Sequence, residues 1–150
     1  MKTHLRPILL LLTLLLLLSA GCSGKNAADL GGDGVDLDLT RLSSTMVYSE
    51  VFNMRYEPEP YYGNALRIRG LFSAYRNPET GEYYYNCIIP DATACCSQGL
   101  QFFPADDLSY PEDFPENGEI VTLRGIFSLD ENNVYMCSIT DAVIESVGEE

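Results

Sequence analysis

The spacing of apolar residues between positions 43 and 56 predicts a helix. Val47, Val51 and Met54 recur at intervals of four and three residues, which places them on one face of a helix. The serines and the threonine at the start of this segment can cap its first turn. Pro58 prevents the helix from continuing, so we expect one short helix with a single buried face.

Beyond residue 64 the apolar pattern changes to that of β-strands. Five segments are rich in β-branched and aromatic residues, and turn-forming Gly, Pro, Asn and Asp residues separate them. These segments are 65–75, 83–91, 99–105, 119–129 and 134–145. A long acidic loop with two prolines follows the third segment.

The β-region also contains an internal repeat. Residues 66–92, "LRIRGLFSAYRNPETGEYYYNCIIPDA", align with residues 121–142, "VTLRGIFSLDENNVYMCSITDA". The matched positions include Gly70 with Gly125 and Cys87 with Cys137. A glycine inside a strand often marks a sharp bend in a barrel. Two bent hairpins joined by a short strand predict a mainly β protein, a five-stranded barrel like the oligonucleotide/oligosaccharide-binding (OB) fold with one N-terminal helix.

The first 21 residues have the layout of an export signal. Lys2 and Arg6 precede a leucine run, and small residues at 19–21 come directly before Cys22. Small residues followed by cysteine resemble the lipobox of bacterial lipoproteins, which implies that Cys22 is lipidated and becomes the new N-terminus. We therefore expect an extracytoplasmic protein attached to the cell membrane through this lipid; an uncleaved anchor and simple secretion are the alternatives.

The rest of the chain divides into two predicted parts. Residues 22–42 form an acidic, Gly- and Asp-rich tether, and residues 43–150 form the barrel domain. Without its signal the chain has 7 basic and 22 acidic residues, a formal net charge of −15. Phosphate binding needs clustered lysine and arginine, so this charge predicts that nucleic acid is not a partner.

Histidine is absent after the export signal, since the only one is His4. This excludes Ser-His-Asp and Cys-His nucleophilic sites and zinc sites with imidazole ligands. The paired aspartates of the repeat, Asp91 and Asp141, either form a carboxylate pair or cap turns after their strands. We therefore do not expect an enzyme.

Four cysteines remain once Cys22 is assigned to the lipid: Cys87, Cys95, Cys96 and Cys137. An even number in an exported protein suggests disulfides, although the adjacent Cys95 and Cys96 are poorly placed to pair with each other. Cys87 and Cys137 occupy equivalent strand positions and should face the same side of the barrel wall. If the loop with the adjacent pair folds over that side, four thiolates would suit tetrahedral zinc. Disulfides, buried thiols, a metal site and reactive redox thiols all remain open.

The segment "DATACCSQGLQF", residues 91–102, resembles a motif of uncharacterised bacterial lipoproteins of the Firmicutes type, written D-A-T-A-C-C-x-Q-G-x-x-F. The resemblance extends over residues 43–145 and implies a lipobox, an acidic linker, one helix and an OB-like barrel. The matching motif positions are Asp91, Cys95, Cys96, Gln98, Gly99 and Phe102. A weaker likeness, to an OB-like permease-associated protein linked with zinc-responsive genes, implies metal handling.

These features together predict a non-enzymatic binding module on the cell surface. The first hypothesis is a zinc-type metal site built from the four cysteines. The alternative is a disulfide-stapled module whose tyrosine-rich barrel face binds a peptide, a glycan or a transporter partner.

Overall fold

The computed structural model of the protein describes residues 34–130 and 133–148. The predicted export signal, Cys22 and the first part of the predicted tether lie outside these residues. In the described part of the chain, no helix is both long and apolar enough to cross a membrane.

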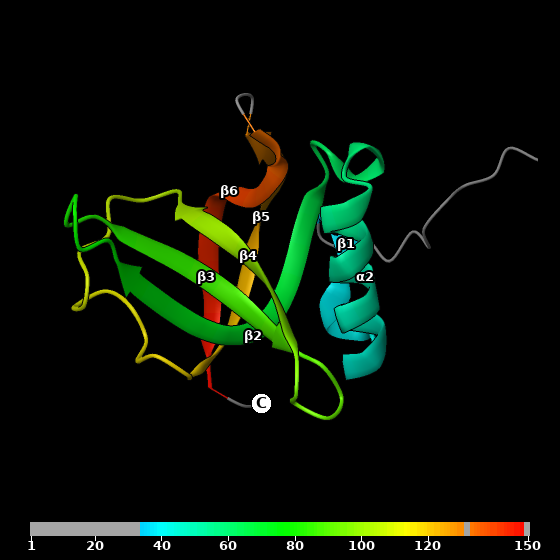
Figure 1. The fold of residues 1–150 in the computed structure, drawn as a ribbon, viewed down its shortest axis with the longest axis horizontal. Helices are drawn as coiled ribbons and strands as arrows, with labels where there is room; N and C mark the ends of the chain where they lie inside the picture. The colour runs from blue at the N-terminus through cyan, green and yellow to red at the C-terminus, as the bar shows by residue number, and fades with distance from the viewer. Residues whose placement is uncertain (1–33, 131–132, 149–150) are drawn as a thin grey trace, which may run out of the picture.

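Five long strands form a closed ring (Figure 1). They pair in the order β2-β3-β4-β6-β5, and β5 pairs back onto β2. Within this ring only β4 and β6 run parallel. The strands are β2 (Ala65–Arg76), β3 (Tyr83–Pro90), β4 (Ser97–Pro104), β5 (Ile120–Asp130) and β6 (Asn133–Val147). The closed five-stranded ring confirms the predicted mainly β, OB-like barrel.

Glycines allow the two repeated hairpins to bend and pack closely. Strand β2 pairs with β5 through residues 65–71 and with β3 through residues 71–76, so it changes partner at Leu71, directly after Gly70. Its curvature is visible in Figure 1. A Cβ atom on Gly70 would lie 2.7 Å from the carbonyl oxygen of Ile88. A Cβ atom on the equivalent Gly125 would lie 2.6 Å from the carbonyl oxygen of Thr140, so both copies need a residue without a side chain here.

The predicted helix is present as α2 (Ser44–Tyr56), which packs against β3, β4 and β6. Its buried residues are Val47, Val51 and Met54, as the spacing predicts. They join a core in which Phe72, Phe102 and Phe127 are fully buried.

The start of the folded domain lies earlier than the sequence indicates. Strand β1 (Leu37–Asp38) pairs parallel with β2, and a short 3-10 helix, η1 (Leu39–Arg41), follows it. Val35, Leu37 and Leu39 are buried. The predicted tether boundary at residue 42 is therefore wrong, because these alternating apolar residues pack onto the barrel.

The acidic loop between β4 and β5 lies on the side of the barrel away from α2 (Figure 1). Phe114 of this loop stacks on Tyr85 with ring centroids 4.2 Å apart, and it lies 5.7 Å from Phe72. Tyr110 packs against the same cluster. The loop is thus fixed to the core through its aromatic residues.

Candidate functional site

Asp91 organises the turn that joins β3 to β4. Its Oδ1 atom accepts hydrogen bonds from the backbone N–H groups of Thr93 and Cys95, both at 3.0 Å. Its own N–H donates to the carbonyl oxygen of Cys96 at 2.9 Å. Asp91 therefore caps the turn, which was one of its two predicted roles. Asp141 is an exposed residue of β6 and is not among the residues gathered around Asp91.

This turn brings one carboxylate and two thiols together at the surface. The Sγ atom of Cys95 lies 3.2 Å from Oδ2 of Asp91 and 3.7 Å from Sγ of Cys96. One donor atom from each of the three residues lies within 4.8 Å of the other two. Both cysteines are exposed and neither is in a disulfide. We call Asp91, Cys95 and Cys96 the β3–β4 donor group.

Hydrogen bonds within the β3–β4 donor group shift the pKa values of Asp91 and Cys96 in opposite directions. The pKa of Asp91 is lowered, chiefly because its carboxylate accepts a hydrogen bond from the Cys95 thiol. The pKa of Cys96 is raised, chiefly by its contact with the Cys95 thiol. The lowered pKa of Asp91 thus keeps the negative charge of the group on the carboxylate.

Cys87 and Cys137 are not part of this group. Both are free and buried in the barrel wall, where burial raises the pKa of Cys87 to about 12 and also raises the pKa of Cys137. The Sγ atom of Cys137 faces the carbonyl oxygen of Met54 at 3.7 Å. The strand period predicts that the two share one side of the wall, and both are buried, but the four predicted metal ligands do not converge. The reason is that the β3–β4 turn holds Cys95 and Cys96 on the outside.

The other motif residues have structural positions. The Gln98 side chain accepts a hydrogen bond from Arg55 at 2.9 Å and contacts the Tyr48 hydroxyl at 3.3 Å, so it ties β4 to α2. Gly99 lies against Ile88, and Phe102 is part of the core. The motif residues therefore attach β4 to α2 and to the core, and they also supply the donor group.

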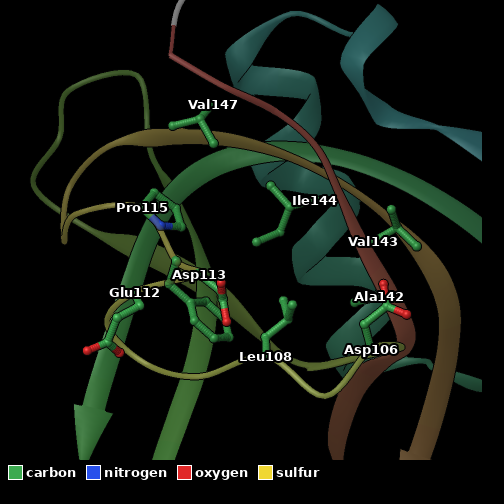
Figure 2. Close-up of a pocket in the computed structure, with 10 residues that line it drawn as sticks. Asp106, Leu108, Glu112, Asp113, Pro115, Ala142, Val143, Ile144 and Val147 are labelled. Atoms are coloured by element: carbon green, nitrogen blue, oxygen red, sulfur yellow. The ribbon is translucent and has the colours of Figure 1, made fainter.

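A second feature of the surface was missed by sequence reasoning. The β4–β5 loop and the end of β6 enclose a groove of about 480 Å³ (Figure 2). Its lining combines apolar residues with Asp106, Glu112 and Asp113. The only sequence signal was the acidic, proline-rich composition of the loop, which does not reveal the strand it packs beside.

The sequence matches no family model and no curated protein. Among solved structures it is similar to a lipoprotein of Klebsiella pneumoniae subsp. pneumoniae that is proposed to bind nucleic acid. That match has 17% identity and a TM-score of 0.40, and it covers 70% of this chain and 81% of the other. This match contradicts the prediction that nucleic acid is not a partner. That prediction rested on the charge of the whole chain, which carries no information on local surfaces, and it is withdrawn. The strand order and the closure of the ring make this chain a mainly β protein with an OB-like barrel.

Proposed function

We propose that this protein is a membrane-anchored extracytoplasmic lipoprotein that binds a metal ion of the zinc type through the β3–β4 donor group. The observation that carries the proposal is the convergence of Asp91, Cys95 and Cys96 on one exposed turn. The proposed role is binding without catalysis.

The spacing of the donor atoms supports zinc. Two thiolates on one tetrahedral zinc ion lie about 3.8 Å apart, because each Zn–S bond is about 2.3 Å long. The two sulfurs of the turn lie 3.7 Å apart. A carboxylate oxygen is a common third ligand, and thiolates favour zinc over magnesium or calcium.

The exposure of the group suggests reversible loading rather than a structural metal. Structural zinc sites have four protein ligands, whereas three ligands leave one position for water, a small chelator or a donor from a partner protein. The hydrogen bonds from Thr93 and Cys95 already hold Asp91 in place, so little ordering is needed when the metal arrives. A site of this type on a lipid anchor suits the capture of metal at the cell surface and its transfer to a transporter.

Zinc titration of the reduced mature chain tests this function. We expect one equivalent of zinc, measured by competition with a chromophoric chelator. Cys95→Ser and Cys96→Ser should each weaken binding by about tenfold or more, because each removes one of three ligands. Asp91→Asn keeps an acceptor for the turn but removes the charge, so it should weaken zinc binding while preserving the fold.

Cys137→Ala is the matched control, since it removes a thiol outside the β3–β4 donor group. Near-ultraviolet circular dichroism of the tyrosines verifies that each variant remains folded. Zinc binding that survives the loss of both Cys95 and Cys96 would contradict the proposal. The same holds if the fully reduced protein binds no zinc.

A further inference from the structure

The groove beside β6 has an apolar floor and an acidic rim. Leu108 and Phe114 of the β4–β5 loop line one side, while Ile144 and Val147 of β6 line the other. Figure 2 shows Leu108 and Ile144 inside the groove, with Asp106 and Glu112 on opposite sides of it. The volume of about 480 Å³ lies within the range of roughly 300–1,000 Å³ common for ligand sites.

The charged residues that line this groove are acidic. Within the described part of the chain, the charged residues that line it are Asp106, Glu112 and Asp113, and all three are exposed. The Asp113 carboxylate accepts a hydrogen bond from the Ser109 N–H at 2.9 Å, which fixes its position in the loop. On the neighbouring strand, Arg124 is already ion-paired with Glu145 at 3.0 Å. An incoming cation therefore meets carboxylates without a neutralising cation among the lining residues.

Both walls of the groove are held in place by the fold. Phe114 stacks on Tyr85, which anchors the loop wall to the core. The N–H of Ala105 donates to the carbonyl oxygen of Ala142 at 2.9 Å and joins the loop directly to β6. A groove that is already formed loses little free energy through ordering when a ligand binds.

We propose that this groove binds an extended cationic peptide segment in which lysine or arginine alternates with an apolar residue. The apolar side chain would lie on Leu108 and Ile144, and the basic side chains would reach Asp106 and Glu112 on either side. A second copy of this chain fits poorly, because its formal net charge of −13 has the same sign as the rim. The groove is separate from the β3–β4 donor group: the donor turn precedes β4, and the loop follows it.

Fluorescence anisotropy tests the groove directly. The probe is a labelled pentapeptide that alternates lysine with leucine, and the protein is the full mature chain at low salt. We expect saturable binding that weakens as salt is added. The double variant Asp106→Asn/Glu112→Gln should weaken binding by about tenfold. Val147→Asn should also weaken it, because it places a polar group on the apolar wall.

The control is Glu79→Gln/Glu82→Gln, which removes the same charge from the exposed β2–β3 hairpin. It should bind the peptide like the parent protein. Three results would overturn the proposal: no saturable binding, an equal loss in the control, or equal binding of the peptide with glutamate in place of lysine. Saturable binding of labelled oligothymidylate in the absence of peptide, weakened by Val147→Asn, would also overturn it, because the groove would then take a nucleic acid.

Discussion

Burial separates the four described cysteines into two pairs with different chemistry. We expect an alkylating reagent to modify Cys95 and Cys96 in the native protein and Cys87 only after unfolding. Cys95 and Cys96 are exposed, whereas Cys87 is fully buried with its pKa raised to about 12. The thiolate is the reactive form, so Cys87 is both inaccessible and protonated near neutral pH.

Pulse labelling followed by peptide mass spectrometry measures this difference. Labelling in denaturant is the control, since all four thiols should then react. Modification of Cys87 in the native protein as fast as Cys95 would show that the barrel wall is open at that strand.

Glu145 lies between two arginines and links strands β2, β5 and β6. Its carboxylate is 2.7 Å from Arg67 and 3.0 Å from Arg124. The hydrogen bond from Arg67 is the largest cause of a lowered Glu145 pKa. We expect Glu145→Gln to reduce the free energy of unfolding by about 1 kcal/mol at neutral pH, near the top of the range for partly exposed ion pairs.

The sign of the pH dependence follows from the lowered pKa of Glu145. The carboxylate stabilises the folded state at every pH above the pKa of an unfolded glutamate, about 4.3. This contribution is lost as the pH falls through the lower pKa of the folded state. Urea unfolding of the parent and the variant should therefore converge in acid, while the exposed Glu79→Gln should show no such difference at either pH.

At the scale of elements, Gly70 and Gly125 are positions where the addition of one methyl group would force neighbouring backbone atoms to move. A Cβ on Gly125 would lie 2.5 Å from Cγ2 of Ile139 and 2.6 Å from the carbonyl oxygen of Thr140. We expect Gly125→Ala to cost about 1–3 kcal/mol, as overpacking commonly does. The midpoint of urea unfolding measures the loss.

Gly99→Ala provides the comparison for this bend. Its added Cβ would meet the end of the Ile88 side chain at 2.9 Å, and the next contact, a backbone carbonyl oxygen of Cys87, is at 3.5 Å. A flexible side chain can yield, so the loss should be smaller than at Gly125. Equal losses would show that the close approach of β5 and β6 does not require glycine.

Elements with a sustained period could be predicted from the sequence, and short ones could not. The helix and the five long strands follow from spacing and from the repeat. The pairing of Leu37 with Leu66 depends on a partner far along the chain, and the glycines and aspartates around Leu37 concealed it. Similarly, strand period predicts that Cys87 and Cys137 face the same side of the wall. Only the path of the β3–β4 turn decides that Cys95 and Cys96 lie outside.

At the scale of the whole molecule, closure of the barrel could be predicted but the groove could not. The repeat indicates two bent hairpins, and a closed ring protects their edges. The groove joins a loop around Leu108 to strand residues around Ile144, and no local pattern connects these segments. Net charge is also a property of the whole chain, so it could not locate an acidic rim or exclude a ligand elsewhere.

The barrel core is independent of the β3–β4 donor group, and this predicts how metal affects stability. Three buried phenylalanines and the α2 face pack together without contribution from Cys95 or Cys96. We therefore expect chelator-treated, reduced protein to remain folded, unlike structural zinc domains, which unfold without metal. Zinc at a free concentration 100 times its Kd should add at most about 2.7 kcal/mol to the free energy of unfolding, and less if unfolded thiols also bind it.

Thermal or urea unfolding with and without zinc measures this gain in the free energy of unfolding. The Cys95→Ser/Cys96→Ser variant should lose the gain while keeping the metal-free stability of the parent. Unfolding by chelator would contradict a loading site, since it would mean that metal holds the fold together. An equal zinc gain in the double variant would place the metal elsewhere on the chain. A gain confined to the parent, with a stable metal-free form, is the behaviour expected of a carrier, because the protein must survive each release of its ion.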